Sequence, residues 1–230
     1  AERCLTDIVR TEKFRRALKE TIKAGDTAVK ANANTGKTIV EAGAGTGILA
    51  MMAAAMGARK VYTVEINPQT VKACRTFLEY CGFDRNVVEV IEGDATKCNL
   101  PEQADMIVSE NMYTGLFAEP QMQIINNLRR FLKPNGKIIP EKFSSYLELV
   151  EAPGLTEKSV VRNEAKIPLK PATTRAQFDV VNFGRDEEVS RQGTVIIRAT
   201  NNATIEAVNV SSVIDLTSQT RINSNTCDFL

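Results

Sequence analysis

Hydrophobic and polar residues follow two different patterns along the chain, and the change falls near residue 144. Before it, short apolar runs alternate with segments whose apolar residues recur at helical spacing. This predicts a parallel sheet whose strands alternate with helices. The expected strands are 38–41, 60–64, 87–91, 105–108 and 137–139, and the expected helices are 7–23, 48–56, 68–80 and 121–132. After it, apolar and polar residues alternate at 145–150, 176–181, 193–199 and 204–214, which predicts antiparallel strands.

The two patterns predict a two-domain protein of the α/β class. Residues 1–143 are expected to form a Rossmann-like domain with a doubly wound, mainly parallel sheet and an N-terminal helix at 7–23. Residues 144–230 are expected to form a smaller antiparallel β-barrel or sandwich for the acceptor, with 152–174 as an excursion between its strands. The sequence begins without Met and ends at Cys-Asp-Phe-Leu, so truncation at either end stays open.

Composition and charge exclude several classes of protein. Hydrophobic residues make up 43% of the 230 residues and charged residues 25%, as in an ordinary globular protein. The net charge is +1, which gives no overall attraction to nucleic acid or membrane, and no apolar run is long enough to span a bilayer. The chain has no His, and its five Cys form no C-x-x-C pair, so no metal site is expected. We expect reduced thiols and a cytoplasmic protein.

Candidate chemistry begins where the first strand ends. Glu41 closes this strand and is followed by Gly43, Gly45 and Gly47, after which a helix of small residues begins. Such a turn allows positive φ and close approach of a ligand to the backbone, while the helix start favours an anionic group. The glycine spacing differs from the G-x-G-x-x-G pattern of dinucleotide sites. A doubly wound protein that binds NAD, or no ligand, is the alternative.

Two further acids close the next two strands. Glu65 ends the second strand, 24 residues after Glu41, and suits the two hydroxyls of a ribose. Asp94 ends the third strand and is placed to accept a hydrogen bond from an adenine amino group. Three acids that close three successive strands resemble the S-adenosylmethionine (SAM) site of class I methyltransferases.

The loop after the fourth strand carries two glutamates, Glu110 and Glu119, nine residues apart. A hairpin there would bring both carboxylates to one pocket. Paired carboxylates suit a guanidinium, whose N–H donors form a planar fork. The alternative is that Glu119 only caps the helix that begins at Pro120.

Four segments are similar to the protein arginine methyltransferases: residues 5–11, 41–65, the double-glutamate loop 109–119, and 129–140. The resemblance covers about residues 5–150 and persists weakly over 178–217. It implies an enzyme that transfers a methyl group from SAM to a guanidinium nitrogen, releasing S-adenosylhomocysteine. Its substrate would be a protein or peptide.

The resemblance also implies roles for individual residues. Arg10 matches the arginine that contacts the cofactor carboxylate, and with Glu41 it would lie near the methionine part of SAM. Glu65 would hold the ribose hydroxyls. The adenine would contact Asp94, as in the general fold, or Thr96, as the family favours. The glycines would shape the loop, and Glu110 and Glu119 would orient the acceptor nitrogen.

The chain departs from this family at several points. Asn111 stands where the family has Trp, and with no His or Trp the chain lacks the family's Thr-His-Trp turn up to residue 230. The segment that matches the dimerisation arm, 151–177, is short, which leaves a homodimer open. Two other functions stay open: an RNA or small-molecule methyltransferase on the same core, and a non-catalytic SAM-binding regulatory subunit. DNA and membranes are not expected partners.

Overall fold

The computed structural model describes residues 7–23, 36–116, 118–155, 168–185 and 188–224. Its helices are α2 (Ile8–Lys23), α3 (Ile48–Ala55), α4 (Pro68–Tyr80) and α5 (Gln121–Leu128), with 3₁₀ turns η1 (Thr114–Leu116) and η2 (Arg129–Phe131). The first five strands are β1 (Thr38–Ala42), β2 (Lys60–Glu65), β3 (Val88–Glu92), β4 (Ala104–Ser109) and β5 (Leu132–Ile139). The others are β6 (Lys142–Glu151), β7 (Lys170–Pro171), β8 (Ala176–Asn182), β9 (Ala207–Asp215) and β10 (Arg221–Asn223). Within these ranges no helix is long and apolar enough to cross a bilayer.

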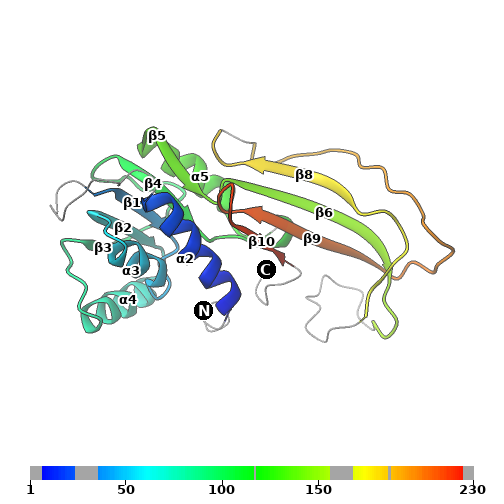
Figure 1. The fold of residues 1–230 in the computed structure, drawn as a ribbon, viewed down its shortest axis with the longest axis horizontal. Helices are drawn as coiled ribbons and strands as arrows, with labels where there is room; N and C mark the ends of the chain where they lie inside the picture. The colour runs from blue at the N-terminus through cyan, green and yellow to red at the C-terminus, as the bar shows by residue number, and fades with distance from the viewer. Residues whose placement is uncertain (1–6, 24–35, 117, 156–167, 186–187, 225–230) are drawn as a thin grey trace.

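Strands β1 to β5 form sheet A, at the left of Figure 1, in the order β3-β2-β1-β4-β5. Every neighbouring pair is parallel, and the central strand β1 is buried along its whole length. The chain moves outward from β1 through β2 to β3 and then returns to the other side of β1 with β4. The carboxyl ends of β1 and β4 therefore flank the point at which the strand order reverses, where open α/β sheets bind ligands.

Helix α4 shows why the local sequence specifies its element. Asn67 precedes the helix and its side-chain oxygen accepts the N–H groups of Gln69 and Thr70, at 2.9 and 3.3 Å. Pro68 occupies the first helical position, where its missing N–H costs nothing. The buried residues Val71, Cys74 and Leu78 recur at helical spacing. The predicted bounds of this helix are confirmed.

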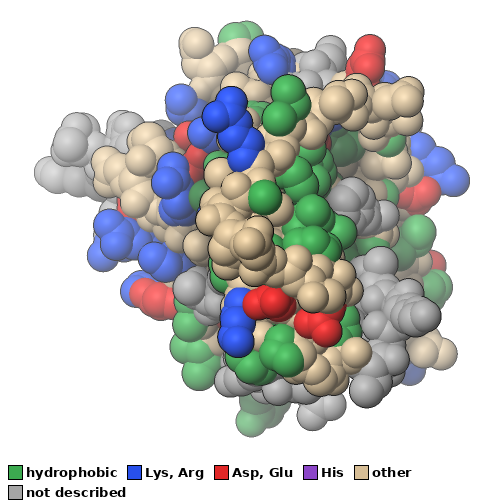
Figure 2. All heavy atoms as spheres, turned by 90° about the vertical axis from the view of Figure 1, so that its right-hand side faces the viewer, with side chains coloured by type: hydrophobic (Ala, Val, Ile, Leu, Met, Phe, Trp, Pro, Cys, Tyr) green, Lys and Arg blue, Asp and Glu red, His purple; other side chains and the backbone are tan. Residues whose placement is uncertain are grey.

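Strands β6 to β10 form sheet B, at the right of Figure 1, which curls into an antiparallel half-barrel. The long strand β6 pairs along one edge with β9, and along the other with β8 and β7. Phe143 of β6 lies opposite Val181 and Ile214, and these three residues are fully buried in the same hydrophobic core as sheet A. Figure 2 looks at the far end of this sheet and shows a band of hydrophobic side chains there.

Helix α2 crosses the front of the molecule between the two sheets (Figure 1). Phe14 and Leu18 are buried in the core. Near its end, Glu20 accepts hydrogen bonds from the hydroxyls of Thr217 and Thr220, at 2.7 and 2.9 Å, in the turn between β9 and β10. The helix that carries Arg10 is thus attached to both parts of the protein.

The predicted fold class is confirmed, but several elements differ from the prediction. Strands β7 and β10 were not expected, β6 begins three residues earlier than expected, and β9 begins three residues later. Segment 193–199 forms no strand. It makes an isolated bridge between Thr173 and Ala199 and hydrogen bonds between Arg198 and Thr174, but no strand among the described residues pairs with it and its Ile196 is 81% exposed. The helix predicted at 121–132 ends as α5 at Leu128 and continues as η2. Strand β5 begins five residues earlier than expected and includes Asn135, at φ 65°, opposite a shift in register with β4.

The predicted domain division after residue 143 stays a prediction. Strand β6, the first strand of sheet B, begins at Lys142, close to this division. The predicted excursion 152–174 lies largely outside the described residues.

Candidate active site

The three glycines after β1 play different structural parts. Gly43 and Gly47 both have φ of 80°, a conformation that other residues rarely adopt. A Cβ at Gly43 would lie 2.7 Å from the Asn111 side chain, and one at Gly47 would lie 3.0 Å from the Cys74 sulfur. At Gly45, with φ 52°, a Cβ would meet nothing within 4 Å. Two glycines therefore allow close packing, while the middle one borders open space.

Glu65, at the end of β2, lies directly against this turn. One carboxylate oxygen accepts the Gly45 N–H at 3.1 Å and the other accepts the Asn67 N–H at 3.0 Å. The N–H groups of Gly43 and Ala44 donate to the Val64 carbonyl, at 2.9 and 3.1 Å, which closes the turn onto the end of β2. The structure thus brings Glu65 and the glycine turn together.

Asp94 and Thr96 share one turn after β3. An Asp94 carboxylate oxygen accepts the Thr96 N–H at 2.9 Å and the Thr96 hydroxyl at 2.7 Å. These hydrogen bonds hold the pKa of Asp94 below its ordinary value. Just before the turn, Gly93 donates its N–H to the backbone carbonyl of Glu65, at 2.9 Å. Both predicted adenine contacts, Asp94 and Thr96, therefore lie in the turn that directly follows Gly93, the residue hydrogen-bonded to Glu65.

Glu41 is almost completely buried, at 2% exposure. Burial raises its pKa to about 8, although the Thr63 hydroxyl and the Ala50 N–H both donate hydrogen bonds to it and favour its ionised form. The Thr63 bond is 2.7 Å long. The charges of Glu65 and Glu110 raise the pKa further. A cation placed beside Glu41 would reverse this shift.

Glu110 leaves the end of β4 and forms an ion pair with Arg10 of α2, with 2.8 Å between the Arg10 Nη1 and a Glu110 oxygen. Both side chains are largely buried, at 16% exposure for Glu110 and 7% for Arg10. Burial raises the pKa of Glu110 to about 7, Arg10 opposes this, and the charges of Glu119 and Asp7 add to it. The structure thus joins the predicted cofactor residue Arg10 to the predicted catalytic residue Glu110.

Glu119 is exposed at the other end of the same loop. Its charge acts on Glu110, so the two glutamates lie within electrostatic reach of each other. The N-cap position of α5 is Pro120, which makes no side-chain capping hydrogen bond. Glu119 precedes this N-cap, so a role at the start of α5 stays the alternative to a role at the acceptor.

Asp7 is a site residue that the sequence reasoning missed. One of its oxygens accepts the Arg10 N–H at 2.9 Å and caps α2, while the other is buried without a hydrogen-bond partner among the described residues. Asp7 is only 3% exposed and its charge acts on Glu110. An aspartate three residues before Arg10, at a helix start, was a capping signal in the sequence.

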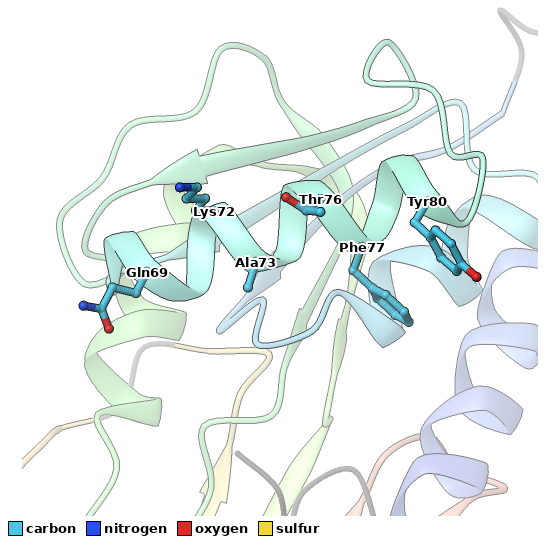
Figure 3. Close-up of a pocket in the computed structure, with 6 residues that line it drawn as sticks. All are labelled: Gln69, Lys72, Ala73, Thr76, Phe77 and Tyr80. Atoms are coloured by element: carbon cyan, nitrogen blue, oxygen red, sulfur yellow. The ribbon is translucent and has the colours of Figure 1, made fainter.

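A hollow of about 540 Å³ lies on the outer side of α4 (Figure 3). It is lined by α4 residues alone: Gln69, Lys72, Ala73, Thr76, Phe77 and Tyr80. It shares no residue with the cluster described above. We therefore assign the candidate site to the carboxyl ends of the strands and not to this hollow.

Comparison with known proteins relates this geometry to a methyltransferase domain. Residues 39–136 match the family model of that name. An uncharacterized protein of Methanocaldococcus jannaschii is 38% identical over 150 residues, which cover 64% of this chain and 52% of that protein. Protein arginine N-methyltransferase PRMT10 of Arabidopsis thaliana is 38% identical over 106 residues, which cover 46% of this chain and 27% of the relative. The chain thus spans about half of one relative and about a quarter of the other.

Solved structures of arginine methyltransferases are also similar to this chain. The open crystal structure of Arabidopsis thaliana protein arginine methyltransferase 10 has a TM-score of 0.55 and 33% identity, over 65% of this chain and 40% of that one. A Trypanosoma brucei PRMT1 enzyme–prozyme heterotetrameric complex with AdoHcy has a TM-score of 0.71 over 97% of this chain and 75% of that one, and at 21% identity it shows the fold alone. These findings confirm the class I, SAM-dependent methyltransferase domain and its resemblance to the arginine methyltransferases.

Proposed function

We propose that this chain methylates a guanidinium nitrogen of arginine in a protein or peptide, with SAM as the methyl donor. The observation that carries the proposal is the buried Glu110 at the reversal point of sheet A, which already binds the guanidinium of Arg10 and lies within electrostatic reach of Glu119. In the reaction the nitrogen forms a bond to the methyl carbon, the bond from sulfur to that carbon breaks, and the nitrogen loses a proton. The products are S-adenosylhomocysteine, methylarginine and a proton.

The residues at the carboxyl ends of β1 and β2 fit the donor. The open space over Gly45 leaves room for a ligand against the backbone, and Glu65 beside it offers two oxygens to ribose hydroxyls. The positively charged part of bound SAM would stabilise the buried Glu41 in its ionised form. Arg10 would pair with the carboxylate of SAM. Bound SAM supplies the activated methyl group.

The double-glutamate loop supplies the acceptor side. Two carboxylates can accept several N–H donors of a guanidinium, and each such charge-assisted hydrogen bond contributes about 1.5–3 kcal/mol. A guanidinium that joins Arg10 at Glu110 adds positive charge beside that carboxyl, which lowers its pKa and keeps it ionised for binding. The chain's task is then to orient one nitrogen and to exclude water around it.

The proposal is tested by transfer of labelled methyl from SAM to an arginine-rich peptide mixture and, in parallel, to bulk RNA. Mass spectrometry locates the label. We expect methylarginine with the wild-type protein, none with Glu110→Gln, and similar SAM affinity in the two. The matched control is Glu89→Gln, because Glu89 is the second residue of β3, is 47% exposed and pairs with Lys60.

Each outcome has a clear consequence. Label in RNA with untouched peptides would retain the donor site and reject the guanidinium acceptor. Full turnover by Glu110→Gln would reject the role of Glu110. Light scattering on the same sample would measure whether the chain forms the homodimer that the sequence left open.

A further inference from the structure

Gln121, the first residue of α5, is a polar side chain with no exposed surface. Its side-chain oxygen accepts the Ser109 hydroxyl at 2.8 Å and the Asn111 N–H at 3.1 Å, and its nitrogen donates to the Ser109 carbonyl at 3.2 Å. The backbone N–H can only donate and the carbonyl can only accept, so these partners fix the orientation of the amide. All three bonds are made to the two residues that flank Glu110.

This arrangement holds the backbone on both sides of Glu110 with one side chain from another element. Gln121 is itself anchored, because Ile125 and Leu128 of the same helix are completely buried in the core. The loop between β4 and α5 thus has a rigid attachment at the point where Glu110 leaves the strand. An apolar residue of similar shape would fill the same space but would release Ser109 and Asn111.

We infer that Gln121 is a positioning residue that sets the place of the Glu110 carboxylate, an inference that rests on the proposed function of Glu110. Gln121 itself need not touch either substrate, since it acts through the backbone of Ser109 and Asn111. Misplacement of a reacting group by about 1 Å can lower a rate by about 100-fold. Loss of the three hydrogen bonds should therefore reduce the methyl-transfer rate and leave the binding of SAM largely unchanged.

The inference is tested with Gln121→Met, which keeps the length of the side chain and removes its hydrogen bonds. The matched control is Gln123→Met, the same substitution two residues later on the exposed side of α5. We expect Gln121→Met to lower kcat by about tenfold or more, with the Kd for SAM within about twofold of wild type, and Gln123→Met to change neither. A general packing defect would instead change SAM binding and kcat together.

A third variant, Ser109→Ala, tests whether the effect passes through Ser109. It removes the hydroxyl that donates to Gln121, and with it the contact of that hydroxyl with the Asn111 side-chain oxygen at 3.1 Å, while leaving the side-chain volume almost unchanged. Combined with Gln121→Met, it should lower kcat by clearly less than the product of the two separate effects, because both remove the same contact. Simple multiplication of the two effects would contradict a shared mechanism.

Hydrogen exchange separates this inference from the proposed function. The Asn111 amide should exchange faster in Gln121→Met than in wild type or Gln123→Met, whatever the substrate. If wild type methylates arginine and Gln121→Met has an unchanged kcat, the inference is wrong and the proposed function stands. If no arginine is methylated, the proposed function fails. Unchanged exchange at Asn111 in Gln121→Met then also overturns the positioning inference.

Discussion

Replacement of Glu41 by glutamine should change how the stability of the ligand-free protein depends on pH. The pKa of Glu41 is raised from 4.5 to about 8, mainly by burial. At pH values below about 4.5 the carboxyl is protonated in both folded and unfolded chains, and its contribution to stability is fully present. Between that value and about pH 8 the unfolded chain loses this proton while the folded chain keeps it, so the free energy of unfolding falls as pH rises.

The magnitude follows from the size of the shift. Each pH unit within this window removes about 1.4 kcal/mol, so a rise from about pH 5.5 to 7.5 costs about 3 kcal/mol through Glu41 alone. The Glu41→Gln variant has no ionisable group at this position, so it lacks this part of the slope. Glu110 gives a slope of the same sign up to about pH 7, but it is present in both proteins. The difference between wild type and variant therefore reports Glu41 together with its interaction with the Glu110 charge.

The assay is urea unfolding followed by far-ultraviolet circular dichroism, since the chain has no Trp to report by fluorescence. Wild type, Glu41→Gln and the surface control Glu89→Gln are compared at three pH values from about 5.5 to 7.5. We expect Glu41→Gln to gain stability relative to wild type by about 1.4 kcal/mol for each pH unit. Curves of wild type and Glu41→Gln that run parallel over this range would refute the argument that buried Glu41 keeps its proton.

Four further substitutions test the surroundings of the site, two of them in the glycine turn. Ser212→Ala removes the hydroxyl that accepts the buried Gly115 N–H at 2.9 Å, and should cost about 1–3 kcal/mol in urea unfolding and speed amide exchange at Gly115. Gly47→Ala should lower stability by more than the roughly 1–2 kcal/mol that positive φ costs, because its Cβ also meets the Cys74 sulfur, and thermal melts would show it. Gly45→Ala should cost only about 1–2 kcal/mol but weaken SAM binding several-fold in calorimetry, since its methyl group enters the open space above the turn. Glu65→Ala should raise the Kd for SAM while changing the transfer rate at saturating SAM much less. A Kd equal to that of wild type would contradict the proposed contact of Glu65 with the ribose.

Local patterns in the sequence predicted much of the fold and most of the candidate site. One strand–turn–helix–strand unit contains Glu41, the glycine turn that follows it and Glu65. Their spacing in the sequence was therefore enough to place Glu65 beside the glycine turn. Glu110 could be placed because β4 returns beside β1 in a doubly wound sheet. Segment 193–199 shows the limit of such patterns, because alternation indicates a strand only where a neighbouring strand and a covered face exist.

Apart from Asp7, whose capping contact is local, the residues that the sequence did not reveal act through contacts between distant segments. Gln121 and Ser212 are ordinary polar residues in the sequence, and their importance comes from single backbone groups that they meet in the loop after β4. The same holds for the pKa of Glu41, which depends on the burial that surrounds it. Hydrogen bonds of this kind require atomic positions, which a hydrophobic pattern does not contain.

The charges of the site point to the kind of ligand that it accommodates. Burial raises the pKa values of Glu41 and Glu110, and nearby negative charges add to it: Glu65 and Glu110 act on Glu41, and Glu119 and Asp7 act on Glu110. Arg10 pairs with Glu110 and opposes the shift there. Burying several carboxyl groups with one cation costs stability, and such a cost is expected where function requires it. Two cationic groups, a sulfonium donor and a guanidinium acceptor, would compensate these carboxylates, whereas a neutral or anionic acceptor would not. The electrostatics of the described residues are therefore consistent with the proposed guanidinium acceptor, which the methyl-transfer assay tests against RNA.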